Sequence, residues 1–143
     1  MKIGFFCNEY PPRAHGGIGT FVRVLAEALA AQDHQIVVVE WGDAERERMQ
    51  VGVRVVTLPE SRMSKVAWFI NRWRLRRWLT KAVAVGAIDV FEIPEYQGCL
   101  PFPCGDCPVV VRLHLAESLI AHLMGGGRGR PLIYWLEKAT LRW

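Results

Sequence analysis

The sequence predicts an α/β protein, built as a Rossmann-like parallel sheet with helices on both of its faces. Short apolar segments alternate along the chain with segments of helical periodicity. The apolar segments have few polar residues at alternate positions, which is typical of parallel strands buried on both faces. The 143 residues suffice for one domain, and 51% apolar with 22% charged residues is a globular composition.

The N-terminal segments predict a strand, a loop, a helix and a second strand. Lys2–Asn8 is a short apolar run and is expected to be a strand, and the prolines and glycines of Glu9–Gly17 predict a loop. Apolar residues at three- and four-residue spacing predict an amphipathic helix over Ile18–Ala31. Gln35–Trp41 is expected to be a buried strand, and the charged segment Gly42–Gln50 a surface loop.

The same alternation continues through the rest of the chain. Pro59 and Gly86 are stop signals for a strand and for a long helix. The expected elements are strands over Val51–Leu58, Asp89–Ile93 and Pro108–His114, helices over Met63–Val85, Glu117–Met124 and from Leu132 onward, and a Pro/Gly/Cys loop over Pro94–Pro108. The last helical pattern reaches Trp143 without a cap or a following strand, so we expect a chain truncated before the last strands of its domain.

Positive charge is concentrated in one segment. The net charge is +4, from 18 basic and 14 acidic residues. Between Glu60 and Asp89 there is no acid, and an anionic partner is expected to bind there. The apolar runs are far shorter than the roughly 18 residues of a membrane span. The N-terminal residues form no secretory signal pattern, so we expect a cytoplasmic protein.

Three of the four cysteines share one loop. The spacing Cys99-x4-Cys104-x2-Cys107 matches three ligands of a plant-type 2Fe–2S cluster. A cluster needs a fourth thiolate, and no cysteine follows Cys107, while Cys7 belongs to the first strand and is expected to be buried there. We therefore expect no metal and no cofactor, and the sequence assigns these cysteines no role.

A glycine-rich segment, Gly16–Thr20, separates the first strand from the first helix. Bare backbone N–H groups at a helix N-terminus bind phosphate, and glycine lets the phosphate approach closely. A dinucleotide site is an alternative, with Glu40 as the ribose-binding acid. That site would place its first glycine directly after the strand and a third glycine where Val22 stands. The other alternative is that the glycines only form a turn.

Five segments carry a resemblance to a known family. They are Tyr10–Pro12 with Gly16–Thr20 and Val22–Leu29, Asp33–Val39, Asp89–Tyr96, Pro108–His114, and Leu136–Lys138 with Arg142. In this order and at these spacings they resemble the N-terminal domain of GT-B-fold glycosyltransferases of family 4. The resemblance covers nearly the whole chain. Two departures are Asp33, which replaces a glycine, and a loop around Arg13 that is one residue longer.

The resemblance implies a retaining, metal-independent transfer of a sugar from a nucleotide-sugar donor to a hydroxyl of a glycan or lipid acceptor, in glycolipid or surface polysaccharide synthesis. It places Gly16 and Gly17 at the donor diphosphate and His114, as a catalytic residue, beside the donor sugar. A C-terminal domain absent from this chain would hold the nucleotide, so residues 1–143 would be the acceptor-side half. The alternative is a non-catalytic Rossmann-like module that binds a nucleotide or an anionic membrane surface.

Polar residues follow two of the predicted strands at the carboxyl edge, where open α/β sheets bind ligands. His114 ends one strand and could donate a hydrogen bond to a sugar hydroxyl or a phosphate oxygen; the alternative is a core histidine. Glu95 and Tyr96 follow another strand. Glu95 could bind acceptor hydroxyls and Tyr96 could stack on a sugar, whereas the alternative for Glu95 is an exposed loop acid.

The long basic helix has two apolar arcs. At about 100° per residue, Leu75 and Leu79 belong to the arc expected to face the core, and Phe69 and Trp73 to the other. The second arc is flanked by bases: Lys65, Arg72, Arg74, Arg76, Arg77 and Lys81. Aromatic residues between two basic stripes suit an anionic bilayer, here the inner face of the cell membrane. The alternative is contact with another part of the protein. Nucleic acid is not expected, because no other segment supplies a binding platform.

Overall fold

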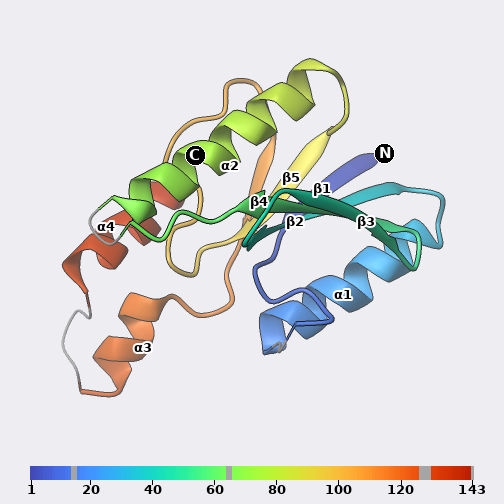
Figure 1. Cartoon of the computed structure of the whole chain (residues 1–143). Helices are drawn as coiled ribbons and strands as arrows, with labels where there is room; N and C mark the ends of the chain where they lie inside the picture. The colour runs from blue at the N-terminus through green and yellow to red at the C-terminus, as the bar shows by residue number, and fades with distance from the viewer. Residues whose placement is uncertain (14–15, 64–65, 126–129, 143) are drawn as a thin grey trace.

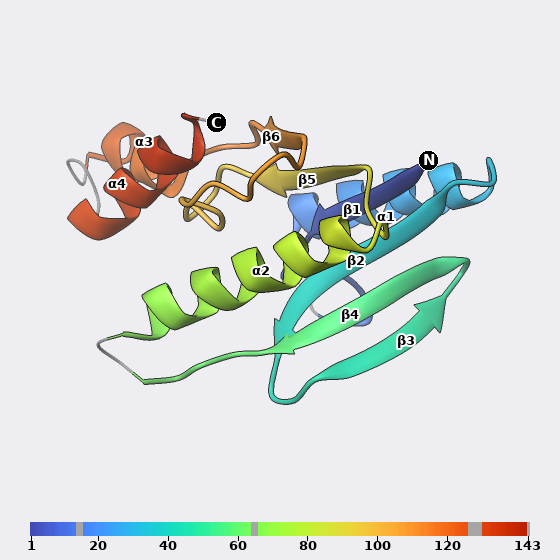
Figure 2. The ribbon, with the colours of Figure 1, turned by 90° about the horizontal axis from the view of Figure 1, so that it is seen from above.

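The sheet has six strands and determines where all other elements lie. The structure is a computed structural model of the chain and describes residues 1–13, 16–63, 66–125 and 130–142. The strand order is β3-β4-β2-β1-β5-β6 (Figure 2). The strands are β1 (Lys2–Phe6), β2 (Gln35–Gly42), β3 (Arg46–Gln50), β4 (Val53–Pro59), β5 (Val90–Pro94) and β6 (Val109–Arg112). All neighbouring strands are parallel except β3 and β4.

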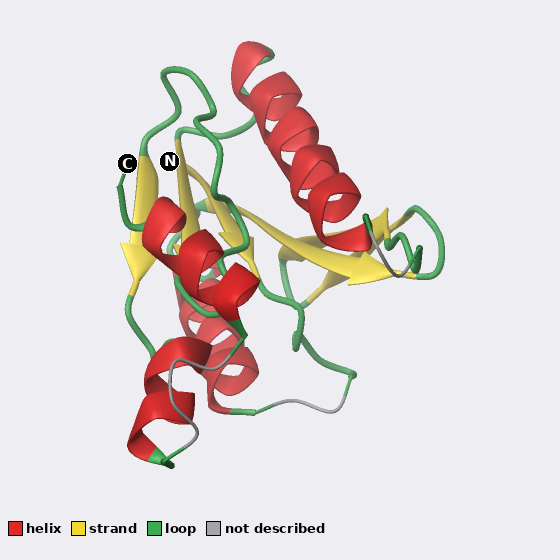
Figure 3. Ribbon diagram, turned by 90° about the vertical axis from the view of Figure 1, so that its left-hand side faces the viewer, coloured by secondary structure: helices red, strands yellow, loops and turns green. Residues whose placement is uncertain are grey.

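Helices cover both faces of the sheet, as the sequence predicts. Helix α1 (Gly17–Ala30) lies against one face and α2 (Ala67–Ala84) against the other (Figure 1). Two shorter helices, α3 (Glu117–Leu123) and α4 (Pro131–Thr140), lie beyond the ends of the strands (Figures 1 and 3). The expected α/β, Rossmann-like architecture is therefore confirmed.

Two apolar cores explain why the strands lack polar alternation. Successive side chains of a strand point to opposite faces, so a strand covered on both sides is apolar at every position. Phe5 and Val38 pack in the core beneath α1, while their neighbours Phe6 and Val39 pack in the core beneath α2. The α1 core also contains Tyr10, Val22, Ala26, Ile36, Val53 and Val55. The α2 core includes Leu75, Leu79, Phe91 and Ile93.

The prediction of a loop over Gly42–Gln50 is wrong. Residues Arg46–Gln50 form β3, an antiparallel edge strand paired with β4. Its polar sequence is typical of an edge strand, which faces water along one side. The hairpin closes through Val51 and Gly52, both with positive φ, at 48° and 76°. Such turns usually contain Asn-Gly or Asp-Gly. Because Val51 stands at the first turn position instead, the sequence lacks the usual pattern that predicts a hairpin. The sheet is accordingly mixed rather than wholly parallel.

Helix α2 buries the arc that its sequence predicts, although its ends lie inside the expected range of Met63–Val85. Leu75 and Leu79 are fully buried, and Phe69 and Trp73 on the other arc are 46% and 42% exposed. Lys65, one of the flanking bases, lies outside the described residues. Among the described residues, no helix has both the length and the apolar character needed to cross a membrane.

Candidate functional site

The polar residues predicted to form the site follow strands that are neighbours in the sheet. Strand β5 lies between β1 and β6, so the ends of all three meet at one edge. The loop after β1 leads to Gly16, Glu95 follows β5, and His114 follows β6. This is the carboxyl edge, where open parallel sheets place their ligands.

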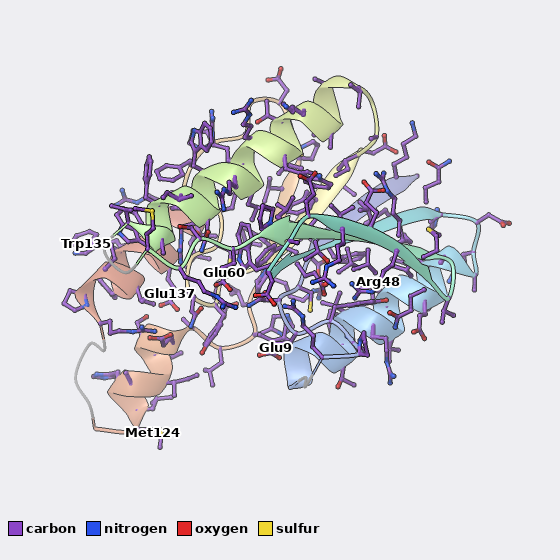
Figure 4. The ribbon with its side chains drawn as sticks, in the orientation of Figure 1. Glu9, Arg48, Glu60, Met124, Trp135 and Glu137 are labelled. Atoms are coloured by element: carbon purple, nitrogen blue, oxygen red, sulfur yellow. The ribbon has the colours of Figure 1, made fainter. Side chains whose placement is uncertain are left out.

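Helix α1 begins directly after Gly16, without a side-chain cap. The N–H of Gly16 donates to the Glu9 carboxylate at 3.0 Å (Figure 4). In the described part of the chain, the first turn of α1 has neither a capping side chain nor an acidic residue. The first N–H groups of the helix lie at the positive end of the helix dipole, and Gly17 at this end is exposed, whereas Gly19 is buried. This arrangement suits a phosphate group.

Gly17 leaves room for a ligand at this helix end. The residue is exposed, and a Cβ built on it would meet no atom of the described residues within 4 Å. Neither packing nor a positive φ requires glycine here. The space in front of Gly17 is thus open toward solvent, as close approach of a phosphate would require.

His114 lies beside the first turns of α1. Its imidazole packs edge-on against the ring of Phe21, with the ring centroids 5.5 Å apart. The guanidinium of Arg112 lies over the same Phe21 ring, 4.7 Å from the centroid. Arg112 is itself paired with Glu92 through two hydrogen bonds, of 2.6 and 2.8 Å. Phe21 thus links the end of β6 to the helix that carries the glycine turn.

Glu95 is buried and directed at the backbone of His114. The side chain is 3% exposed, and both of its oxygens lie 2.9 Å from the His114 backbone nitrogen. The backbone N–H of Glu95 donates to the carbonyl of Arg112, so β5 and β6 are joined at this level by two contacts. Glu95 is therefore not an exposed loop acid. Tyr96, the next residue, is half-buried.

Glu137 on α4 is a second buried carboxylate near this edge of the sheet, and its role is not among those predicted from the sequence. It is 2% exposed and accepts from the backbone N–H groups of Gln97, Glu117 and Ser118, at 3.0, 2.7 and 3.2 Å. It thereby caps α3 and ties it to the loop after β5 (Figure 4). The sequence does contain a signal for this role: Glu137 shares the buried face of α4 with Leu136 and Thr140, and an acid on a buried face needs polar partners.

Arg72 of α2 also holds the loop after β5 in place. Arg72 donates to the carbonyl of Gly98 at 2.7 Å and to the carbonyl of Gln97. Gly98 has φ +56°, and a Cβ there would come within 2.2 Å of the Leu136 backbone. Arg72 is half-buried, and its charge is directed at this loop rather than at solvent.

Glu40, the acid that a dinucleotide site would need, is engaged inside the fold. It is 2% exposed, forms an ion pair with Arg48 at 2.8 Å and accepts from the Thr57 hydroxyl at 2.9 Å. Its partner Arg48 comes from β3, the strand that the sequence did not predict (Figure 4). A ribose hydroxyl would have to displace these contacts. Glu40 is therefore not available as the ribose-binding acid of a dinucleotide site.

Comparison with known proteins identifies the family. A sequence model described as a glycosyl transferase 4-like domain matches residues 16–143. The chain belongs to this glycosyltransferase family. The resemblance found in the sequence is thereby confirmed, and it supports a role in glycosyl transfer in general terms. Neither the comparison with curated proteins nor the comparison with solved structures gives a match.

The surface of this glycosyltransferase domain also carries an aromatic groove on α2. It has a volume of about 290 Å3 and is lined by Phe69, Trp73, Arg76, Phe102 and Pro103. The rings of Phe69 and Phe102 meet edge-to-face at 5.9 Å, and the Arg77 guanidinium lies 5.3 Å from the centre of the Trp73 ring. Arg76 donates to the Pro103 carbonyl at 2.6 Å, which holds the loop against the helix.

The glycosyltransferase domain shows no metal-binding cluster in its described part. No group of three or more His, Cys, Asp or Glu residues among the described residues could hold a metal ion. Cys99 donates to the Tyr96 carbonyl at 3.5 Å, whereas Cys104 and Cys107 lie together elsewhere in the same loop.

Proposed function

We propose that this domain is the acceptor-side half of a retaining, metal-independent glycosyltransferase. The complete enzyme moves a sugar from a nucleotide-sugar donor to a hydroxyl of a glycan or lipid acceptor. A C-terminal domain supplies the nucleotide site. The observation that carries the proposal is the contact between His114 and Phe21, because it brings the histidine after β6 next to the helix whose first turn is open to a phosphate.

The charge that develops during transfer suits this helix end. When the bond between the sugar and the diphosphate breaks, negative charge accumulates on the diphosphate. The N–H groups of the first turn of α1 and the helix dipole stabilise that charge without any rearrangement. His114 then donates a hydrogen bond to a donor-sugar hydroxyl or a phosphate oxygen from the neighbouring strand end.

The acceptor is proposed to lie at Glu95 and Tyr96. Tyr96 is half-buried and offers a ring for stacking on a sugar. The Glu95 carboxylate already accepts the His114 N–H, so a hydroxyl bound there would share an oxygen with that contact. Tyr96 is consequently the more accessible of the two.

A membrane-bound acceptor is favoured by one further observation, the aromatic groove on α2. Phe69 and Trp73 are exposed between Arg76 and Arg77, as expected of a helix that rests on anionic headgroups. Arg72 is the less available base, because its guanidinium makes two hydrogen bonds to carbonyls of the loop after β5, whereas Arg76 makes one, to Pro103. A membrane-bound acceptor places the enzyme at the inner face of the cell membrane, in glycolipid or surface polysaccharide synthesis.

The test is a transfer assay on the complete protein with a panel of labelled nucleotide sugars and a lipid extract as acceptor. We expect labelled product from the complete protein and none from residues 1–143 alone, because half a cleft cannot orient both reactants. Turnover by residues 1–143 alone would contradict the two-domain proposal. If the complete protein bound nucleotide or vesicles but transferred no sugar, the non-catalytic module would be the correct interpretation.

A further inference from the structure

Two cysteines in the loop between β5 and β6 flank a tight turn. Gly105 and Asp106 form the turn, and Cys104 and Cys107 stand on either side of it. Gly105 has φ +71°, a conformation that glycine adopts without strain. A four-residue turn brings the Cα atoms of its end residues within about 7 Å, and disulfides need a Cα separation of about 4.4–6.8 Å. The backbone therefore holds the two cysteines at a spacing suited to a disulfide.

Cys104 and Cys107 line one cavity. Both are free, and the residues are only 7% and 8% exposed. They line a cavity of about 260 Å3 together with Leu100, Phe102, Pro103, Gly105 and Val109. Within the described residues, each thiol has one long hydrogen bond to a carbonyl, Cys104 with Phe102 at 3.8 Å and Cys107 with Pro108 at 3.7 Å. Little would be lost if these contacts were exchanged for a bond between the sulfurs.

The other two cysteines have different surroundings. Cys99 donates to the Tyr96 carbonyl, and its electrostatic neighbours are Arg72 and Glu137. Cys7 is fully buried near Glu9 and Glu40 at the end of β1. Neither lines the cavity that Cys104 and Cys107 share.

We propose that Cys104 and Cys107 form a reversible disulfide by exchange with a low-molecular-weight disulfide of the glutathione type. One cysteine, as thiolate, attacks the small disulfide and releases one small thiol, which leaves a mixed disulfide. The second cysteine thiolate then displaces the other small thiol. In sum, two electrons and two protons pass from the cysteine pair to the small disulfide, which becomes two thiols.

The exchange is slow at neutral pH and accelerates in alkali. Burial raises the pKa of Cys104 to about 11 and also raises the pKa of Cys107, so few of these thiols are ionised near pH 7. Because the thiolate is the attacking species, the rate rises roughly tenfold per pH unit below that pKa. Cys104 and Cys107 therefore respond to the sustained ratio of small disulfide to small thiol around the protein, and a brief pulse of oxidant leaves them reduced.

The disulfide would restrain a loop that contacts α2 on one side and leads into β6, and so toward His114, on the other. Arg76 of α2 holds the Pro103 carbonyl, and Phe102 packs on Phe69. From Cys107 the chain runs through Pro108 directly into β6, after which comes His114. Disulfide formation between these thiols does not depend on glycosyl transfer.

The test is thiol counting on the native protein after incubation with excess oxidised glutathione at pH 8.5, followed by denaturation, alkylation and intact-mass measurement. Of the four cysteines in residues 1–143, we expect two to escape alkylation, and peptide mapping to join Cys104 to Cys107. Dithiothreitol should restore all four. With Cys104→Ser or Cys107→Ser, the remaining partner should end as a glutathione adduct instead of a disulfide.

Cys99→Ser and Cys7→Ser are the matched controls and should leave the bond intact. Circular dichroism confirms that each variant is folded before oxidation. Four alkylated cysteines after prolonged oxidation would overturn the proposal. A bond mapped between Cys7 and Cys99, or one that persists in Cys104→Ser, would overturn it as well.

Discussion

The two carboxylate oxygens of Glu95 lie at equal distances, 2.9 Å, from the backbone nitrogen of His114. The contact joins the end of β5 to the end of β6 and is partly buried, since Glu95 is only 3% exposed and His114 is half-buried. It fixes the main chain at the residue whose ring packs on Phe21. The position of the His114 imidazole relative to α1 therefore depends on a neighbouring carboxylate as well as on its own strand.

Glu95→Ala should destabilise the protein by about 1–3 kcal/mol, because it leaves the partly buried His114 N–H without its acceptor. Glu95→Gln keeps an acceptor oxygen in place and should cost less. Urea unfolding measures both, with Glu60→Ala as a control at an exposed acid. If Glu95→Ala unfolded at the wild-type urea concentration, the contact would contribute nothing to stability.

The free energy of unfolding should fall above pH 9. Burial raises the pKa of Cys7, Cys99 and Cys104 from 9.0 to about 11 each, and that of Tyr10 from 10.0 to about 12. Unfolded thiols lose their protons first as the pH rises, so stability is complete below pH 9 and declines toward pH 11. Each group contributes a slope of about 1.4 kcal/mol per pH unit at most.

Cys7→Ala tests whether buried thiols cause the fall in the free energy of unfolding above pH 9. Cys7 is fully buried, and the variant should lose less stability between pH 9 and 10.5 than the wild type in urea titrations. An identical dependence in both proteins would show that the Cys7 thiol titrates normally in the folded state.

Gly17→Val should lower transfer by the complete protein steeply while the melting temperature changes little. A Cβ at this position meets no atom of the described residues within 4 Å, and a branched side chain would occupy the space in front of the first N–H groups of α1. Ala28→Val, on the exposed side of the same helix, is the matched control and should transfer normally. Wild-type kinetics in Gly17→Val would mean that the glycines serve only as a turn.

Binding to anionic vesicles should require the aromatic residues of α2 as well as its charges. Phe69→Ser with Trp73→Ser removes exposed apolar area and leaves every base in place, so co-sedimentation with anionic vesicles should weaken markedly. Leu119→Ser with Leu123→Ser removes exposed apolar residues from α3 instead and should have no effect. High salt should weaken wild-type binding, since each base near the surface contributes about 1 kcal/mol.

Two outcomes would contradict this account of α2. If the double serine variant of Phe69 and Trp73 bound as well as the wild type, the attraction would be purely electrostatic and the aromatic groove would belong to a protein interface. If the wild type ignored anionic vesicles, the membrane proposal would be wrong.

Hydrophobic patterning predicted most of the fold, because strands covered on both faces and an amphipathic helix leave distinct signals. Asp33 shows that a departure from the family pattern can be accommodated, as it adopts φ 61° where the family has a glycine. The β3–β4 hairpin escaped prediction because Val51 occupies a turn position that usually holds Asn or Asp. Local patterns do not encode tertiary partners, and the contacts of Glu95 with His114 and of Glu40 with Arg48 are of that kind.

The central claim is that His114 and the first turn of α1 act on the same donor. The most direct measurement is kcat/KM for sugar transfer by the complete protein carrying His114→Ala. His34→Ala is the control, because His34 lies before β2 at the opposite edge of the sheet. We predict a loss of about 10² or more for His114→Ala, roughly 3 kcal/mol, as expected when one polar contact to developing charge is removed. A lower melting temperature with unchanged kcat/KM would contradict the account and make His114 a structural residue.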